Sequence, residues 1–317
     1  RRPPRSTLFP YTTLFRSYSD QASLIQTGGT IDVLDAVVVG GTGEPQFDDN
    51  GYVELSGGAF FANRLLIGGN NNASCVIHGD SVVGITTDVV VGRLAGTHGS
   101  LQLYDDAVLT CDRLLVRNGG SVTQNMGHNM LNTGGIEVSD GSYVFMGTES
   151  ANGTINNSGS MIIGGSDGGD ALFHQSSGTF NGGVLQVQQT AGGTAEYLLE
   201  GGGSADFTDI RVGVGGTGTL TLQGTYAEMA GDNLYIATAL GSQGTLDFSA
   251  GILNVGTLTT GAGNGDATIN QTGGTLNATT VATSLADGSA AYQIRGRFLN
   301  ADTDEGVPLL GGCVKAG

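Results

Sequence analysis

The sequence has no tryptophan, only five prolines and three cysteines, and a single lysine, Lys315, in 317 residues. No stretch approaches the ~20 apolar residues of a membrane-spanning helix, so we expect no membrane span in this segment. Acidic residues outnumber basic residues 29 to 12. Without clustered Lys and Arg, the chain is not expected to bind nucleic acid or an anionic membrane.

The cysteines also exclude one class of fold. Cys75, Cys111 and Cys313 are odd in number and show neither CxxC nor metal-ligand spacing, which argues against a disulfide framework. Cys75 and Cys111 lie inside short apolar runs, where cysteine usually behaves as a small buried apolar residue. We therefore expect both thiols to be buried.

Glycine and aliphatic residues are what the sequence has in quantity. There are 57 glycines, and 38% of the residues are hydrophobic. Many glycine-rich chains are disordered, but here Val, Ile and Leu recur at short, regular intervals, which provides apolar surface to offset the entropy of ordering. The composition predicts a folded, repetitive protein.

Residues 1–17 differ from the rest of the chain, because they hold four basic residues, no acid and three of the five prolines. All eleven residues of the run Thr7–Ser17 resemble the translation of a common short-read sequencing adapter. We set residues 1–17 aside as an artefactual or disordered segment. The natural N-terminus is then expected to be missing.

One apolar position repeats along nearly the whole remaining chain, with spacings of 22 to 28 residues. This first column consists of Val39, Ile67, Val91, Val116, Val138, Ile163, Val187, Val212, Ile236, Thr260 and Thr283. Each member ends a short aliphatic run and precedes Gly or a small or polar residue. Such a period indicates a stack of similar structural units.

Two further apolar columns keep a similar period. The second contains Ile77, Leu101, Met126, Phe173, Tyr197, Leu222, Leu246 and Ile269, and the third contains Val83, Val108, Phe180, Ala205, Met229, Ile252 and Leu276. Residues beside the columns alternate between apolar and polar, which is typical of strands. Gly-Gly, Asn-Gly and Asp-Gly pairs between the runs favour turns with positive φ.

These patterns predict an all-β parallel β-solenoid over residues 18–294, with about 24 residues and three strands per turn. Roughly eleven turns at ~4.8 Å each would form a rod ~50 Å long. The general crossover preference favours right-handed winding. A β-sandwich explains the short strands but requires no apolar position to recur at one fixed period. The columns weaken between Ser121 and Ser160, where we expect a bulge or side loop, and residues 295–317 are expected to form an irregular cap or tail.

Blocks such as Gly216–Gly224 and Ile269–Asn277, rich in glycine and threonine, resemble the β-strand repeats of autotransporter passenger regions and of PEP-CTERM-type exported bacterial proteins. The resemblance covers about residues 20 to 294. It implies an adhesin-like protein that is located outside the cell or on the outer cell surface. Neither a translocator barrel nor a Pro-Glu-Pro sorting tail is visible in the sequence.

A catalytic site is not evident. Arg64, Arg93 and Arg113 recur near the first column and form a candidate basic stripe, with solvated arginines on a rim as the competing interpretation. Asp105 and Asp106 are expected on a turn without an acid–base partner. No nucleophile elbow or phosphate-binding loop is present, so no catalytic residue and no cofactor is assigned.

The histidines and the acidic turns are the candidate metal ligands in the sequence. His78 and His174 fall in one column but four turns, ~19 Å, apart, too far to share a metal ion. His98 and His128 fall elsewhere in the turn, and all four histidines are expected to be exposed. The acidic turns 164–170 and 263–266 resemble calcium-binding corners, with ordinary solvated turns as the alternative.

Two functional hypotheses follow. The first is an extracellular or cell-surface structural or adhesive protein without catalytic activity, whose ladders of Thr, Asn, Gln and Asp make weak multivalent contacts. The alternative is a carbohydrate-binding or carbohydrate-cleaving parallel β-helix. Extracellular polysaccharides and cell-surface components are the expected partners. Unpaired strands at the two ends also predict end-to-end self-association.

Overall fold

The computed structural model describes residues 21–41, 50–69, 71–125, 127–146, 153–165, 169–261, 264–283, 290–294, 299–305 and 315–316. Within these ranges the chain is a parallel β-solenoid and contains no helix. Paired residues in neighbouring turns, such as Asn132 and Asn156, are 24 positions apart. No helix that could cross a membrane was found in the described residues. The predicted all-β parallel β-solenoid with about 24 residues per turn is therefore confirmed. Residues 1–17 and Cys313 lie outside the described residues.

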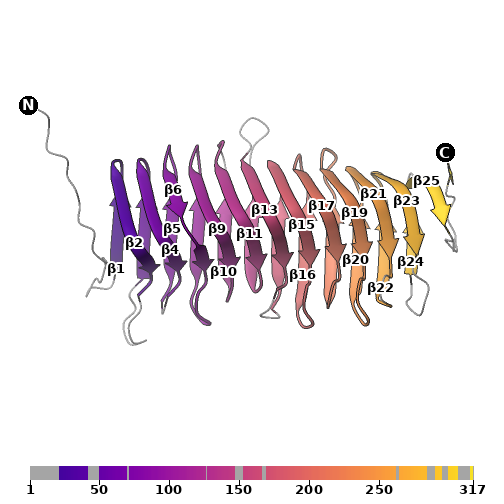
Figure 1. The fold of residues 1–317 in the computed structure, drawn as a ribbon, viewed down its shortest axis with the longest axis horizontal. Helices are drawn as coiled ribbons and strands as arrows, with labels where there is room; N and C mark the ends of the chain where they lie inside the picture. The colour runs from indigo at the N-terminus through magenta and orange to yellow at the C-terminus, as the bar shows by residue number, and fades with distance from the viewer. Residues whose placement is uncertain are drawn as a thin grey trace, which may run out of the picture.

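Two parallel sheets run along the rod, and successive turns lie side by side from the first strand to the last (Figure 1). The short-strand sheet contains β1 (Gln21–Gln26), β3 (Asn50–Leu55), β5 (Ala73–Ile77), β8 (Gly99–Leu103), β10 (Gly120–Gln124), β12 (Gly141–Phe145), β14 (Ala171–Gln175), β16 (Thr194–Leu199), β18 (Thr217–Leu222), β20 (Gln243–Phe248), β22 (Asp266–Gln271) and β24 (Ala290–Ile294). Its 12 strands are close to the predicted eleven turns without matching that number.

The second sheet has 14 strands, most of them nine or ten residues long, and we call it the long-strand sheet. It contains β2 (Thr30–Val39), β4 (Ala59–Ile67), β6 (Val82–Ile85), β7 (Asp88–Val91), β9 (Val108–Val116), β11 (Met130–Val138), β13 (Thr154–Ile163), β15 (Thr179–Val187), β17 (Ser204–Val212), β19 (Glu228–Ile236), β21 (Ile252–Thr260), β23 (Thr275–Thr283), β25 (Leu299–Glu305) and β26 (Lys315–Ala316).

The first apolar column is confirmed at every position. Its eleven residues, from Val39 to Thr283, pair one with the next at the end of the long strands. Those from Val39 to Thr260 are all buried. A single sequence position therefore marks the same corner of the solenoid in every turn.

The second column needs a correction of two residues at two positions. Ile77 pairs with Leu103 rather than with Leu101, and Leu222 pairs with Leu199 rather than with Tyr197. Both still face the core, because a shift of two residues keeps a strand side chain on the same face. Met126 lies outside the described residues.

The third column contains two errors of a single residue. Val83 pairs with Leu109, not with Val108, and Met229 pairs with Leu253, not with Ile252. Leu109 and Leu253 are fully buried, whereas Ile252 is 36% exposed. A slip of one residue turns a side chain to the opposite face, so Val108 and Ile252 point outward.

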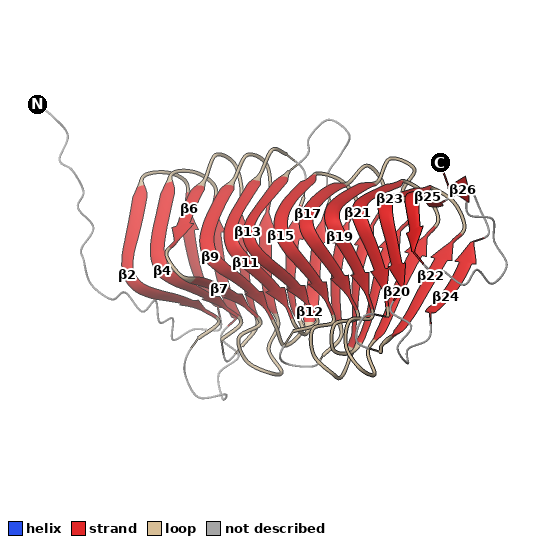
Figure 2. Cartoon of the chain, turned by 45° about the vertical axis from the view of Figure 1, so that its right-hand side comes forward, coloured by secondary structure: helices blue, strands red, loops and turns tan. Residues whose placement is uncertain are grey.

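Most turns have two strands instead of the predicted three, because the first and third columns lie on one continuous long strand. Within the described residues that strand is divided in one turn, into β6 and β7. Elsewhere the alternation of buried and exposed residues changes phase in the middle of the strand, as at Asp112 and Arg113, which both point to solvent. Figure 2 shows the long strands curving part-way along their length. Most turns therefore have three core-facing segments, two of them on one long strand and the third on a short strand.

Aromatic rings stack inside the core along the rod. Phe173 lies between Tyr143 and Tyr197, with ring centroids 4.8 Å and 5.0 Å away. These distances match the ~4.8 Å spacing of neighbouring strands, so the rings follow the backbone repeat. Phe180 meets Phe173 edge-on at 5.8 Å from the long-strand side. The core is therefore continuous between the two sheets.

In most turns the residue after the first column adopts a left-handed backbone conformation, which explains the glycines that follow many of the aliphatic runs. Gly92 has φ +75°, and a Cβ there would lie 1.8 Å from the carbonyl oxygen of Arg117. Gly213, with φ +68°, would meet the carbonyl of Gln243 at 2.3 Å. Glycine is favoured there because a Cβ is strained at positive φ, although Gln188 and Ala237 adopt φ +57° and +58° at the equivalent corner.

The region from Ser121 to Ser160 is more regular than predicted. Val122 and Tyr143 continue the second column, and Leu131 and Ile155 continue the third. The expected irregularity is confirmed as shifts of register between Thr133 and Ile136 and between Asn157 and Ser160. Beyond residue 294, β25 pairs in register with β23, so the long-strand sheet extends into the segment that was expected to be a cap or tail.

Candidate functional site

Three hollows of about 460, 600 and 400 Å³ lie on the outer face of the long-strand sheet. Eleven of the residues that line them occupy one outward position in successive strands. We call this row the groove ladder, and it consists of Asp32, Phe61, Gly84, Thr110, Asn132, Asn156, Asn181, Asp206, Ala230, Asn254 and Asn277. Thr110 lines both the 400 Å³ and the 600 Å³ hollow, and Asn181 of the 600 Å³ hollow pairs in register with Asp206 of the 460 Å³ hollow. The three hollows therefore lie in one line along the rod, and we refer to them together as the groove.

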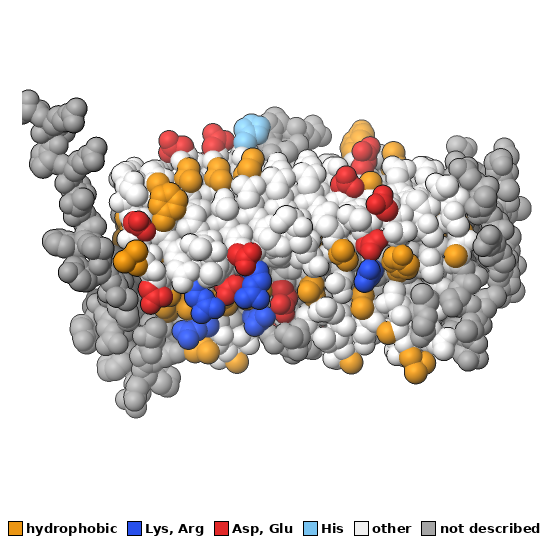
Figure 3. All heavy atoms as spheres, viewed as in Figure 1, with side chains coloured by type: hydrophobic (Ala, Val, Ile, Leu, Met, Phe, Trp, Pro, Cys, Tyr) orange, Lys and Arg blue, Asp and Glu red, His pale blue; other side chains and the backbone are white. Residues whose placement is uncertain are grey.

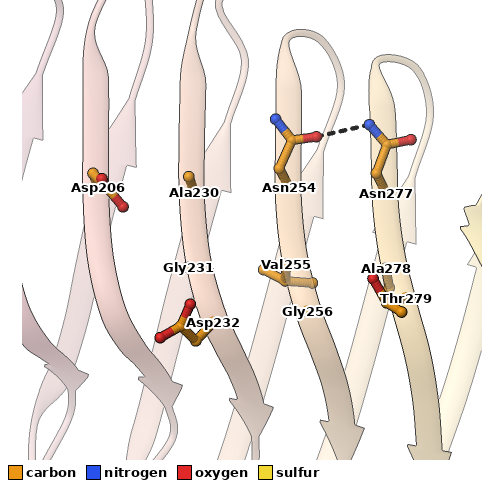
Figure 4. Close-up of a pocket in the computed structure, with 10 residues that line it drawn as sticks. All are labelled: Asp206, Ala230, Gly231, Asp232, Asn254, Val255, Gly256, Asn277, Ala278 and Thr279. Carbon is orange, nitrogen blue, oxygen red and sulfur yellow. Dashed lines mark hydrogen bonds between the residues drawn. The ribbon is translucent and has the colours of Figure 1, made fainter.

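Asparagine side chains link neighbouring strands of the groove ladder. Asn156 Nδ2 donates a hydrogen bond of 3.0 Å to Asn132 Oδ1, and Asn181 Nδ2 donates one of 3.0 Å to Asn156 Oδ1. Further along the groove, Asn277 Nδ2 donates to Asn254 Oδ1 at 2.7 Å (Figure 4). These bonds fix the orientation of each carboxamide and leave its remaining donor and acceptor capacity directed at solvent.

The N-terminal hollow contains an exposed aromatic side chain. Phe61 is 41% exposed, and its ring occupies the place that a Cβ on Gly84 would take, because such an atom would lie 2.8 Å from the ring. Leu34, which is 69% exposed, lines the same hollow. The groove thus combines an apolar end with amides further along.

Charged side chains border the groove more than they line it. Among the described residues lining the three hollows there is no Lys or Arg, and the acids are Asp32, Asp206 and Asp232. Figure 3 shows the middle of this face largely free of charged side chains, with acidic ones above it and both acidic and basic ones below it. The central hollow, from Thr110 to Asn181, is lined by uncharged residues.

Two of the three predicted arginines meet at one carboxylate. Arg64 and Arg113 lie on either side of Asp88 in neighbouring strands, and each guanidinium has a nitrogen 2.8 Å from an Asp88 oxygen. The Asp88 side chain is 5% exposed, against 50% and 56% for the two arginines. Burial opposes ionisation of Asp88, but hydrogen bonds from Arg64 and Arg113 outweigh it and lower the pKa of the carboxyl.

Arg93 does not join this cluster. It is exposed at a corner after β7, while Arg117, which we did not single out, pairs with Glu137 at 3.3 Å. Asp88 was also missed, although it lies one repeat from each arginine, 24 positions from Arg64 and 25 from Arg113. The arrangement is a set of ion pairs on one rim, and among the described residues Asp88 is the carboxylate that pairs with both predicted arginines.

The histidines differ from the prediction in two respects. In the short-strand sheet, His174 lies in the row of paired residues that also contains Val144, Leu198 and Val76. His78 follows Val76 by two positions and therefore does not belong to that row. In addition, both rings are partly buried and contact glutamates, His78 with Glu54 at 3.1 Å and His174 with Glu200 at 2.6 Å. His98 and His128 are exposed, as predicted.

The glutamates that contact these histidines have lowered pKa values. The His78 hydrogen bond, followed by that of Tyr52, lowers the pKa of Glu54. Hydrogen bonds from Gln223 and His174 lower the pKa of Glu200. Each glutamate therefore favours its charged form, as expected for a carboxylate that accepts hydrogen bonds.

Both described cysteines are buried, as predicted. Burial raises the pKa of the Cys75 and Cys111 thiols to about 12, so neither forms a reactive thiolate near neutral pH.

The acidic turns provide no assembled metal site in the described part of the chain. Asp105 and Asp106 lie on a turn, as predicted, and Asp105 accepts a hydrogen bond from the backbone N–H of Gly79. Asp170 accepts hydrogen bonds from the backbone and hydroxyl of Thr194, both at 2.8 Å. Residues 166–168 and 262–263 lie outside the described residues. No group of three or more His, Cys, Asp or Glu that could hold a metal was found among the residues described.

The sequence predicted ladders of Thr, Asn, Gln and Asp, but the position of the groove was not predicted. A usable signal was present, since Asn132, Asn156 and Asn181 follow one another at intervals of 24 and 25 positions. Comparisons of the chain with protein-family models, with curated proteins and with solved structures found no match.

Proposed function

We propose that this protein is a non-catalytic structural or adhesive rod that acts outside the cell or at the outer cell surface. The observation that carries the proposal is the groove ladder, in which the outward position of each long strand is stacked on the next. Repetition of similar polar groups at one strand spacing favours many weak, simultaneous contacts with a surface or polymer. The resemblance to exported bacterial repeat proteins supports the location.

The arrangement of charges supports binding over catalysis. A β-helix that cleaves acidic polysaccharides needs a base beside several carboxylates. Here Arg64 and Arg113 are both engaged by the single carboxylate of Asp88. We assign the cluster a structural role at the rim of the groove.

For the finer architecture, we propose a right-handed winding of about eleven turns with three core-facing segments in each turn. The general handedness of parallel crossovers supports the winding, and the recurrence of three apolar columns supports the segments. Self-association through the rod ends belongs to the same proposal, since terminal strands offer backbone groups for pairing. A molecular mass in size-exclusion chromatography that rises with protein concentration is expected; a monomer at all concentrations would contradict it.

Two assays test the function. Incubation with cellulose, chitin, β-1,3-glucan and polygalacturonate is expected to retain the protein on at least one polymer without releasing reducing ends or unsaturated uronates. Release of sugar products would refute the non-catalytic role. In cells that make the protein, an antibody is expected to label intact cells or the medium, and labelling only after permeabilisation would refute the location.

A further inference from the structure

We infer that the groove ladder is the binding site for one extended, uncharged polysaccharide chain that lies parallel to the rod axis. This inference rests on the proposed binding role of the rod and adds to it the site and the chemical class of the ligand. Three properties carry it: the shape of the groove, the chemistry of its lining and its charge.

The shape selects a linear polymer. Thr110 lines both the N-terminal and the central hollow, and the in-register pair Asn181 and Asp206 connects the central hollow to the third. From Asp32 to Asn277 the ladder spans ten strand spacings, ~48 Å at ~4.8 Å each. The three hollows follow one another along this axis. A long, narrow ligand can contact every hollow, whereas a compact one fills a single hollow.

The lining selects hydroxyl groups. Within Asn132, Asn156 and Asn181, each bond along the ladder uses one Nδ2 hydrogen and one Oδ1 lone pair, and a carboxamide has two of each. The remaining groups form an array of donors and acceptors that repeats once per strand. A sugar hydroxyl both donates and accepts, and an extended pyranose chain advances by a comparable length per ring. Because the ladder already fixes the amides, binding loses little side-chain entropy.

Phe61 supplies the apolar contact that sugar rings also require. Its ring lies over Gly84, where no side chain competes for the space, and 41% of the residue is exposed in the groove. The C–H face of a pyranose can cover such a ring and remove apolar surface from water. Gly182 and Gly183 also line the central hollow and place no side chain in it.

The charge of the groove argues against an acidic polymer. The described lining residues include Asp32, Asp206 and Asp232 but no Lys or Arg, and the whole chain has a net charge of −17. Repulsion therefore disfavours uronate or sulfate polymers. A peptide strand is disfavoured for another reason: the backbone groups of these strands already pair with neighbouring strands, so the face offers no free sheet edge for strand addition.

The test is calorimetric titration of the full chain with cellohexaose, laminarihexaose, mannohexaose, chitohexaose and, as an anionic probe, hexagalacturonate. We expect at least one neutral hexasaccharide to bind and hexagalacturonate to bind more weakly. No binding by any neutral probe, or tighter binding of hexagalacturonate, overturns the inference.

Substitutions locate the site. The combined variant Asn132→Ala, Asn156→Ala and Asn181→Ala is expected to weaken binding about tenfold, which corresponds to ~1.4 kcal/mol. Asn270→Ala is its matched control, because Asn270 makes the same kind of bond, 2.7 Å to Asp247 Oδ1, on the other sheet. Phe61→Ala is compared with Tyr226→Ala, which removes a 77% exposed aromatic outside the groove ladder.

Circular dichroism at the titration temperature checks that each variant is folded. If the triple variant is folded and binds like Asn270→Ala, the groove assignment is wrong. The Phe61→Ala variant, which leaves the amides in place, keeps the inference testable if the triple variant unfolds. Retention of the triple variant on insoluble polymers, with hexasaccharide affinity unchanged, would refute the groove while leaving the adhesive function intact.

Discussion

The hydroxyl of Tyr197 donates a hydrogen bond of 2.6 Å to Gln175 Oε1 in the neighbouring turn, and both side chains are fully buried. Gln175 Nε2 in turn donates to the carbonyl oxygens of Gly178 and Ser204, each at 3.0 Å. Tyr143 and Gln124 form the same kind of pair at 2.8 Å. These contacts place satisfied polar groups inside an apolar column, where they tie the core to the backbone of the next corner.

Replacement of Tyr197 by Phe is expected to lower the free energy of unfolding by ~1–3 kcal/mol, because it leaves the buried Gln175 oxygen without a donor. Urea unfolding followed by circular dichroism measures the change. Tyr226→Phe, at a residue that is 77% exposed, is the control and is expected to have little effect. Equal effects of the two substitutions would show that the buried pair contributes nothing specific.

The repeat was predictable where the sequence pattern marks one position clearly. It was not predictable where two neighbouring residues fit the pattern equally well. The first column was correct throughout because each member ends an aliphatic run before a corner. Gln175 was not recognised as a core residue, since glutamine is usually exposed and its partner is in another turn. Val108 and Leu109 are both aliphatic, so the sequence alone does not show which of them faces the core. The pairing with β6 shows that Leu109 faces inward.

This choice of face can be tested directly. Leu109→Asn is expected to destabilise the protein by ~3 kcal/mol or more, since it buries an amide in an apolar core. Val108→Asn, one residue earlier and outward-facing, is expected to cost less than ~1 kcal/mol. Chemical unfolding of both variants measures the difference. Larger destabilisation by Val108→Asn would mean that the register is shifted by one residue.

The groove was harder to predict than the columns. Asn132, Asn156 and Asn181 follow the period of the repeat, so their alignment was accessible from the sequence. The hollow beneath them was not, because it depends on where the long strands change phase and curve. That change is marked by outward pairs such as Asp112 and Arg113, which a simple alternating pattern does not contain.

The corner conformation leads to another prediction. Gly213→Ala is expected to destabilise the protein by ~2 kcal/mol or more, because the corner has φ +68° and the new Cβ would meet backbone atoms of Gln243. Gly202→Ala is the matched control, since no atom lies within 4 Å of its Cβ position. Thermal unfolding is expected to show a loss only for the first variant. A similar loss in both would indicate that the corner does not require glycine.

The Asp88 cluster predicts a dependence on pH. The arginines lower the pKa of Asp88 in the folded protein, so its stabilisation is present above the ordinary aspartate pKa of ~3.9 and is lost as the pH falls through the lowered value. Asp88→Asn is expected to destabilise the protein by ~1–3 kcal/mol at pH 7. The difference in the free energy of unfolding between Asp88→Asn and the unsubstituted protein is expected to shrink below pH ~4.

Urea unfolding at a series of pH values measures this difference. Asp106→Asn, at an exposed turn residue, serves as the control and is expected to change stability little across the same range. A destabilisation by Asp88→Asn that stays constant down to pH ~2 would contradict the ionic role of Asp88.

The central claim is that the rod consists of parallel strands stacked in register. Distances between two spin labels, measured by pulsed electron–electron double resonance, test it most directly. Spin labels are attached to Ser121→Cys with Thr219→Cys, and to Ser100→Cys with Thr245→Cys, in a Cys313→Ser background. Cys75 and Cys111 are buried and should stay unlabelled. The first pair is four strand steps apart and the second six, or ~19 Å and ~29 Å at ~4.8 Å per step. We predict that the second distance exceeds the first by ~10 Å; equal distances, or a shorter second one, would contradict the stacked solenoid.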